Sequence, residues 1–334
     1  MPLPLSVFAR YAFVVLAVVV LALLVFKLLP VLMLIFAGVV LASALSAGAN
    51  PLQRRLRLGR TWAVTIVFVA FILVVGFGLY FFGVQLAAQM EELVSAVTAA
   101  WQKLRQYAQG SRFLAPLLDN TPSIADPGAF MSVAKETFTV FGALADLVLV
   151  VVLAVYLAAD PVTYRRGLLA LLPPRLRGEV GDTLTASGLA LRRWLGGQLI
   201  AMVVVGACIG IGLWAVGVPL ALALGILSGV LDFVPFVGPL LAAIPGVLIA
   251  FAQGPQMALY AIAVYTAVQF IEGHLVVPIV QKQAVALPPA LTLVAIVAFG
   301  IVFGPAGLFF AVPLTVVTVV MIERLYVRRL ERMA

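Results

Sequence analysis

The sequence predicts an all-α, polytopic membrane protein. Of its 334 residues, 64% are hydrophobic and only 10% are charged, and the mean hydropathy is +1.20. No water-soluble domain of this length has that balance. The apolar runs recur from residue 11 to residue 322, so a cleaved signal peptide does not account for the N-terminus. We expect six spanning helices, two Pro/Gly-broken re-entrant hairpins and one extracytoplasmic amphipathic helix.

The N-terminal region, residues 1–84, contains three predicted spans, the first two separated by a tight connection at Pro30. About 20 apolar residues cross a bilayer as a helix. Four arginines between 54 and 60 predict a cytoplasmic loop by the positive-inside rule, and a cytoplasmic N-terminus because two spans precede it. The three apolar runs are 11–29, 31–48 and 62–83.

Residues 85–135 form the predicted extracytoplasmic part. From Gln85 to Tyr107, apolar residues recur every three or four positions with charged residues between them, the pattern of an amphipathic helix. This helix either lies back on its own protein or contacts a neighbouring subunit. Residues 109–130 are rich in Pro, Asp, Ser and Gly, a composition typical of a loop.

Residues 136–194 combine a fourth span, about 138–158, with a cytoplasmic segment. Six arginines between 160 and 194 favour the cytoplasmic side and also attract anionic lipid. Pro173 and Pro174 separate two amphipathic pieces that we expect along the membrane surface. The formal charge of +8 is concentrated in such clusters beside apolar runs, which argues against a nucleic-acid partner.

Residues 195–334 are the predicted transport core. A span at 195–217 precedes an apolar stretch, 219–252, that is too long for one span and is interrupted by prolines and glycines. Proline inside a helix costs about 3 kcal/mol, and broken helices at membrane depth line a cavity or are buried in protein. A sixth span, about 256–271, precedes a second broken stretch at 288–322.

The two broken stretches resemble each other. We expect two copies of a span followed by a hairpin, in opposite orientation, a plan that recurs in secondary transporters. Chance similarity between two Pro/Gly-punctuated apolar segments remains an alternative, as does full spanning by both copies. The matches are VPLALAL (218–224) with LPPALTL (287–293), FVGP (236–239) with VFGP (302–305), and Pro245 with Pro313.

Few polar residues interrupt the apolar sequence of the core, and these are functional candidates because a charge inside a membrane is costly. Asp232 precedes the first break, and Glu272 and His274 follow the sixth span. In one interpretation Asp232 or Glu272 carries a coupling proton or cation, and unwound carbonyls around Gly238 and Gly304 complete the site. In the other, Asp232 caps a half-helix, and Glu272 and His274 lie at the membrane interface.

The residues that enzymes need are scarce. His274 is the only histidine, so no HExxH zinc site can form, and Cys208 is the only cysteine, so no intrachain disulfide can form. GILSG at 225–229 does not match the GxSxG elbow of hydrolases. We therefore expect no enzyme, no metal site and no cofactor.

Five segments, in this order, closely resemble the autoinducer-2 exporter family of PerM-type permeases: YLAADP, LRRWLGGQLI, GVPLALALGILSGVLDFVPFVGPLLAAIP, FIEGHLVVPIVQKQAVALPPAL and FGPAGLFFAVPL. The resemblance covers about residues 10–330. It implies a multi-spanning transporter of a bacterial or archaeal inner membrane. Members are linked to export of the quorum-sensing signal autoinducer-2, and some to sodium or lithium exchange for protons. The best-studied members are homopentamers, which implies a homo-oligomer here.

The motifs of the family map onto single residues of this chain. The acid before a proline is Glu272 with Pro278, and the later Leu-x-Pro pattern is Leu287 with Pro289. The chain departs from the family at Asp232, where many members carry asparagine, and this change adds a titratable group. It also departs at Phe236, where tyrosine is frequent. The Pro–aromatic–x–Gly–Pro motif is Pro235, Phe236, Gly238 and Pro239.

We therefore predict a secondary transporter that exports a small polar molecule such as autoinducer-2. A sodium(lithium)/proton antiporter and a non-transporting membrane scaffold are the alternatives. We expect a small-molecule or ion substrate, membrane lipid and other copies of the chain as partners, and both termini in the cytoplasm. The predicted pathway residues are Asp232, Pro235, Phe236, Gly238, Pro239, Glu272, Pro278, Gly304 and Pro305.

Overall fold

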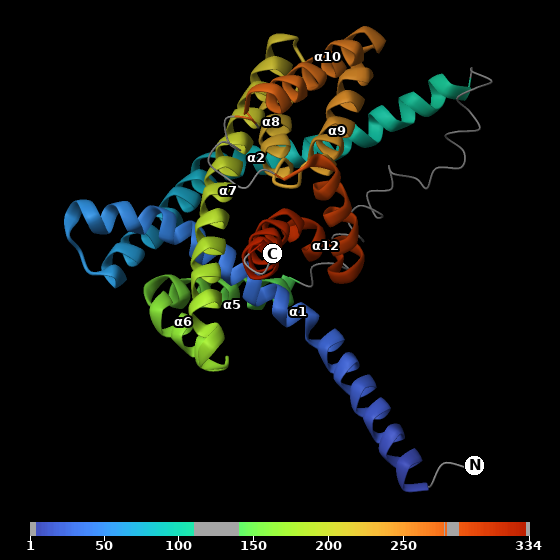
Figure 1. Cartoon of the computed structure of the whole chain (residues 1–334). Coiled ribbons are helices and arrows are strands. Elements are labelled where there is room, and N and C mark those ends of the chain that lie inside the picture. Colours follow the sequence, from blue (N-terminus) through green and yellow to red (C-terminus); the bar gives the residue numbers. More distant parts are fainter. Residues whose placement is uncertain (1–4, 110–139, 277, 279–286, 332–334) are drawn as a thin grey trace.

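The computed structural model describes residues 5–109, 140–276, 278 and 287–331, and every regular element in these ranges is helical, as the sequence predicts. Figure 1 shows the N-terminal part of α1 standing away from a body formed by the later helices. The elements are α1 (Leu5–Leu56), α2 (Arg60–Gln109), α5 (Val140–Ala159), α6 (Pro161–Ala170), α7 (Pro174–Ala215), α8 (Ala221–Leu231), α9 (Val237–Gln253), α10 (Pro255–Ile271), η1 (Glu272–Val276), α12 (Pro289–Ile322), η2 (Glu323–Val327) and α13 (Arg328–Glu331).

Several of these helices are compatible with a membrane. Within the described residues, three are long and apolar enough to cross a bilayer, and a fourth is obtained if the bent pair α5–α6 counts as one span. The number of six spans is not confirmed, and the re-entrant character of the hairpins remains a prediction. The three helical stretches are Phe13–Leu56, Pro174–Ala215 and Pro289–Val327.

The predicted connection near Pro30 is wrong, because α1 continues through this residue as a single helix of 52 residues. Two antiparallel helices need a loop of about two to five residues, and the sequence around Pro30 offers only leucine and valine. A proline alone removes one backbone hydrogen bond and bends a helix without reversing it. The count of two spans before the arginine-rich loop therefore loses its basis, and so does the argument that placed the N-terminus in the cytoplasm.

α2 changes from apolar to amphipathic without a break, and its distal part packs on the α9 helix of the same chain. Trp101 and Leu248 form a small buried cluster, and Lys103 Nζ donates a hydrogen bond of 3.1 Å to the carbonyl of Ala252. This carbonyl is in the last turn of α9, where backbone acceptors lack helical partners. The amphipathic helix thus lies back on its own protein at these residues. The predicted loop at 109–130 falls almost entirely outside the described residues.

α5 agrees with the predicted fourth span, whose first residues lie outside the described part, and a bend of 92° separates it from α6. Asp160 is the N-cap of α6 and accepts a hydrogen bond of 3.2 Å from the amide of Thr163. Hydrogen bonding from the Thr163 side chain, and then from its amide, lowers the pKa of Asp160. Pro161 follows at the first helical position, where its missing N–H costs nothing.

α7 is one helix of 42 residues, so the second amphipathic piece is coaxial with the fifth span and does not lie along the membrane surface as predicted. Gly196 and Gly197, in its middle, each cost only about 1 kcal/mol relative to alanine, which packing on both halves outweighs. Two separate cores meet this helix. Its C-terminal half packs with α8, α9 and α10 through Val205, Ile209 and Leu213, and its N-terminal half packs with α1 and α12 through Leu191, Trp194 and Leu195.

A third core joins α1, α2 and α5, and Arg60 connects the three helices at its edge. The Arg60 guanidinium donates hydrogen bonds to the Ala158 carbonyl (2.8 Å), to Asn50 Oδ1 (3.2 Å) and to Ser46 Oγ (3.2 Å). The sequence marked Arg60 only as part of a charged loop. In the structure it is a tertiary contact, with the fork geometry that arginine provides.

Candidate transport site

α8 and α9 form a helical hairpin whose tip, residues 232–236, points toward α12 (Figure 1). The predicted break is confirmed at this tip, although Pro245 does not interrupt α9. With 11 and 17 residues, the two helices are about 16 and 25 Å long, shorter than the ~30 Å hydrocarbon core. The chain reverses at Phe236, whose φ of 65° is unusual for a residue with a side chain.

Gly238 makes this reversal possible. Its amide donates a hydrogen bond of 2.9 Å to the carbonyl of Val234, and the residue is buried against the end of α8. A Cβ atom at position 238 would overlap the carbonyl oxygen of Leu231. The glycine of the family motif therefore has a steric role at the hairpin tip, where only a residue without a side chain fits.

The second broken stretch also folds back on itself. The kink in α12 lies at Gly304 (φ 64°, ψ −148°), and a Cβ atom at Gly307 would overlap the carbonyl oxygen of Phe299. Residues eight positions apart in a straight helix are about 12 Å apart, so the two halves of α12 meet at a sharp bend. This geometry reproduces the contact between Leu231 and Gly238.

The two bends correspond to each other in a register that differs slightly from the predicted one. The residues with positive φ are Phe236 and Gly304, and their separation in the sequence equals that of Pro245 and Pro313. Gly304 therefore takes the place of Phe236, whereas the match of FVGP with VFGP aligned it with Gly238. The pairing of Pro245 with Pro313 therefore gives the register in which the backbones of the two bends correspond.

Asp232 is the first residue of the tip, directly after α8, and it is only 1% exposed. Gln198 Nε2, on α7, donates a hydrogen bond of 2.8 Å to the backbone carbonyl of Asp232. Neither carboxyl oxygen of Asp232 has a hydrogen-bond partner within the described residues, so the side chain caps neither α8 nor α9 there. Burying an unpaired carboxylate costs several kcal/mol, which sets this residue apart from a structural cap.

Glu272 supplies a second carboxyl group near the tip. It begins the π-helical turn η1 and accepts a hydrogen bond of 2.6 Å from Gln269, and its charge acts on Asp232. π-Helical turns occur frequently at functional sites. His274, in the same turn, is exposed and stacks on Phe270. In the described ranges, no group of three or more His, Cys, Asp or Glu residues could hold a metal ion.

An aromatic cluster that the sequence did not indicate holds the tip in place. Phe233 stacks on Phe309 of α12, with ring centroids 4.2 Å apart, and meets Trp194 of α7 edge to face at 5.8 Å. The three residues come from three separate apolar runs, so no local pattern relates them. They connect the tip to the core that joins α7 and α12.

The remaining residues of the predicted pathway do not form a single cluster around Asp232. Pro235 is half-buried within the tip, and its carbonyl accepts a hydrogen bond of 2.8 Å from Val237. Phe236 is 49% exposed, and Pro239 lies in the first turn of α9. Pro305 is exposed beside the kink of α12, and Pro278 is exposed between residues outside the described part.

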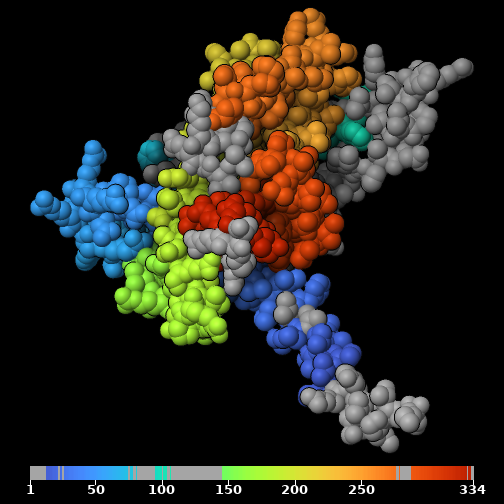
Figure 2. Space-filling model, in the orientation of Figure 1, coloured from blue at the N-terminus to red at the C-terminus, as the bar shows by residue number. Residues whose placement is uncertain are grey.

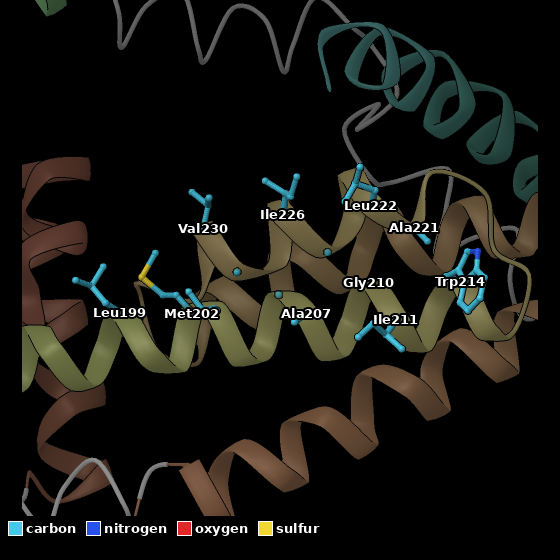
Figure 3. A pocket seen from close by; sticks show the side chains of 14 residues that line it. Leu199, Met202, Ala207, Gly210, Ile211, Trp214, Ala221, Leu222, Ile226 and Val230 are labelled. Atoms are coloured by element: carbon cyan, nitrogen blue, oxygen red, sulfur yellow. The ribbon is translucent and has the colours of Figure 1, made fainter. Parts of the chain in front are cut away.

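A separate open groove of about 620 Å³ runs along α7 and α8, and apart from the indole nitrogen of Trp214 the side chains labelled in Figure 3 are apolar. Glycines bring the two backbones together beneath it, since a Cβ atom at Gly225 would lie 2.7 Å from the carbonyl oxygen of Gly206. Such small-residue contacts are typical of helix packing in membranes. Apart from this indole N–H, the groove offers no polar side-chain group to select a polar substrate, so we do not assign the transport site to it.

Comparison with known proteins identifies the family. The AI-2E family transporter model matches residues 12–327. YueF of Bacillus subtilis (strain 168), named as a transport protein, is 26% identical over 313 residues, which cover 84% of this chain and 81% of YueF. PerM of Escherichia coli (strain K12), named as a permease, is 28% identical over 309 residues, with coverages of 84% and 83%.

A third relative carries a substrate in its name. The AI-2 transport protein TqsA of Escherichia coli (strain K12) is 27% identical over 111 residues, which cover 33% of this chain and 32% of TqsA. The match to the family extends far beyond that segment and includes both broken stretches and the carboxyl groups near the first tip. The chain therefore belongs to the AI-2E family of transporters.

Proposed function

We propose that the protein is a secondary transporter that exports a small polar molecule, with autoinducer-2 as the candidate substrate and the α8–α9 hairpin as its moving element. The observation that carries this proposal is the buried Asp232 carboxyl at the hairpin tip, without a partner in the described residues. The choice of substrate rests on the name of TqsA, which matches a third of the chain.

The chemistry at the tip explains how a polar species would be held. A buried carboxyl group becomes tolerable when it takes up a proton, binds a cation or accepts hydrogen bonds from a ligand. Asp232 stands at the junction of two half-helices that are too short to span a bilayer. We infer that both hairpins are re-entrant, and that the tip carries its ligand between the two sides by alternating access.

Exchange of sodium or lithium for protons is the second candidate function. It is favoured by the charge of Glu272 acting on Asp232, because two neighbouring carboxyl groups bind a proton and a cation in competition. In this version the pair itself is the transport site, and no organic substrate is needed.

Transport by the purified protein in liposomes separates these functions. Export predicts uptake of labelled autoinducer-2 into inside-out vesicles, whereas antiport predicts proton flux driven by a sodium or lithium gradient. Absence of both under every gradient would support a membrane scaffold. Asp232→Asn should abolish either activity or remove its pH dependence, and Glu179→Gln, a cytoplasmic change of the same kind on α7, should not. If Asp232→Asn leaves transport and its pH profile intact, Asp232 is not the coupling residue.

We further propose that the protein is a homo-oligomer in the bacterial or archaeal inner membrane, with its arginine-rich loops and C-terminal tail in the cytoplasm. The N-terminal half of α1 supports the assembly, because the apolar side chains that the structure describes there are largely exposed: Phe13 is 71% exposed and Phe26 is 70% exposed. Lipid or other subunits would cover this surface. Chemical crosslinking in native membranes would give the number of subunits.

A further inference from the structure

Asp146, a carboxylate that the proposed transport mechanism does not use, lines a cavity of about 320 Å³ between α1, α5 and α12. It is the only charged residue of the described cavity wall, and every other lining residue there is apolar. Figure 2 shows the orange-red residues of α12 directly against the blue residues of α1. The apolar wall includes Phe26 and Pro30 of α1 and Phe303, Ala306 and Phe310 of α12.

The carboxylate lies at membrane depth. Asp146 is the only charged residue of α5, and it precedes Asp160, the N-cap of α6, by fourteen residues. Fourteen residues correspond to about 21 Å of helix, which is less than the ~30 Å hydrocarbon core. A charge at this depth is a candidate for function, because it is costly unless it has a partner.

Contacts between α1 and α5 show the level of Asp146 along α1. The C-terminal ends of both helices meet at Arg60, so the two helices run in the same direction. A Cβ atom at Gly38 would lie 2.8 Å from the side chain of Leu153 on α5. Asp146 is seven residues before Leu153, and Pro30 is eight residues before Gly38. The carboxylate is therefore about level with Pro30.

The bend of α12 lies at this level too. Phe310 meets Phe36 of α1 edge to face, with ring centroids 6.1 Å apart, and the later parts of both helices share a core. Gly304, where α12 is kinked, is six residues before Phe310, and Pro30 is six residues before Phe36. A proline, a helix bend and a carboxylate thus surround one cavity.

The prolines of the two helices add backbone acceptors at the same level. Pro30 and Pro305 have no N–H, so the carbonyls of Phe26 and Ile301, four residues earlier, have no helical donor. Carboxylate and carbonyl oxygens both attract positive charge and hydrogen-bond donors. Aromatic faces such as those of the lining phenylalanines also attract cations. The cavity therefore suits a cation and repels an anion.

Its size and its walls favour an organic cation over a metal ion. Hard metal ions take about six oxygen ligands, whereas the described wall offers one carboxylate among apolar side chains. A volume of 320 Å³ equals that of about ten water molecules, enough for an amine of about ten non-hydrogen atoms. A sphere of this volume has a radius of about 4 Å, so a ligand at its centre is within contact distance of the walls.

We propose that this cavity binds a small lipophilic ammonium ion that enters from the membrane. Its ammonium group pairs with Asp146 through a charge-assisted hydrogen bond, and its other N–H groups donate to the freed carbonyls. The hydrocarbon part lies against the apolar walls. The bound cation removes the cost of a carboxylate in the apolar zone. This site is separate from the hairpin tip and does not depend on the function proposed for Asp232.

The test is equilibrium dialysis of the full-length protein in lipid nanodiscs, with empty nanodiscs as background. The probes are 1-adamantylammonium and 1-adamantanol, which has the same cage without the charge. We expect the ammonium ion to bind at least tenfold more tightly, and Asp146→Asn to remove this difference, as the loss of a charge-assisted hydrogen bond requires. Asp182→Asn, the same change at an exposed site of α7 outside the cavity, is the matched control and should change nothing.

A second variant tests the position of the ligand. Ala306→Phe adds a ring from an exposed position in the cavity wall and should weaken binding of both probes. Unchanged binding to this variant would place the ligand elsewhere. Loss of ammonium binding with Asp232→Asn would place it at the hairpin tip. Either result overturns the proposal.

Three further results would overturn the role of Asp146. Equal affinity for the two probes, or a loss with the control as large as with Asp146→Asn, would show that this carboxylate does not select the cation. Displacement of the amine by millimolar sodium would show a site for inorganic cations. Lys27, three residues before Pro30, is exposed and does not line the cavity. Tenfold tighter ammonium binding by Lys27→Gln would show that its side chain already neutralises Asp146.

Discussion

Replacement of Gly238 by alanine tests the geometry of the hairpin tip most directly. The added methyl group would overlap the carbonyl oxygen of Leu231, and a carbon and an oxygen that are not bonded to each other normally stay more than about 3.2 Å apart. The obstacle is backbone, held by the turn at Phe236, so it cannot rotate away as a flexible side chain would. The two helices of the hairpin must therefore separate.

The size of the effect follows from what holds the tip. Overpacking beside adaptable side chains costs about 1–3 kcal/mol, so a clash with backbone should reach the upper end, about 3 kcal/mol. Separating the two helices would also break contacts of the tip that together contribute about 3 kcal/mol. These are the two aromatic pairs of Phe233, at about 1 kcal/mol each, and the Gln198 hydrogen bond, at about 1 kcal/mol. We therefore expect Gly238→Ala to lose about 3 kcal/mol of unfolding free energy and to abolish transport.

Denaturant unfolding in detergent micelles measures this loss, followed by the fluorescence of Trp194 beside the tip in a background where the other three tryptophans of the chain are replaced by phenylalanine. Gly196→Ala is the control, since a Cβ atom there meets nothing within 4 Å and the change favours helix by about 1 kcal/mol. Gly307→Ala should behave like Gly238→Ala, because it meets the Phe299 carbonyl in the same way. If Gly238→Ala stays within about 0.5 kcal/mol of the unaltered protein and transports normally, the tip does not have this geometry.

Three further predictions concern other parts of the protein. Arg60→Lys should cost about 1–3 kcal/mol of unfolding free energy, measured in the same assay, because an ammonium group cannot reach its three acceptors together. Asp160→Asn should speed hydrogen exchange at the Thr163 amide; since the pKa of Asp160 is lowered in the fold, the carboxylate's contribution exists above its ordinary pKa and disappears as pH falls through the lowered value. In a chain with Cys208→Ala, a cysteine at position 5 should react with impermeant reagents from the periplasmic side if α1 crosses once.

The sequence predicted the elements of the core well and their continuity poorly. Prolines and glycines between Asp232 and Pro239 concentrate enough backbone cost to end a helix, and the break lies there. Pro30, the pair Gly196–Gly197 and the pair Pro245–Gly246 stand within long apolar stretches, and the helices continue through them. One breaker costs about 1–3 kcal/mol, which packing or the surrounding helix can outweigh even for a pair, so only the denser cluster of Pro235, Gly238 and Pro239 ends a helix here.

The residues of the candidate site also fall into two groups: those that the sequence indicates and those that only the fold brings together. Asp232 and Glu272 could be found from the sequence, because a charge in an apolar run has a cost that is visible locally. The aromatic contacts of Phe233 could not be found, since Trp194 and Phe309 are ordinary members of apolar runs and meet Phe233 only through the fold. The sequence predicted Gly238 as part of a pathway motif. The structure gives it a steric role, because the turn has no room for a side chain at this position.

The arrangement of the cores indicates where movement would be least costly. α8, α9 and α10 share one core with the C-terminal half of α7, while α12 shares another with its N-terminal half. The hairpin belongs to the first core, and its tip also contacts α12 and α7: Phe233 stacks on Phe309, and Gln198 donates a hydrogen bond to the Asp232 carbonyl. Withdrawing it would break contacts worth about 3 kcal/mol and leave both cores intact, which corresponds to a minor state populated at about 1%. A ligand on Asp232 that binds the withdrawn tip about a hundredfold more tightly would balance the two states.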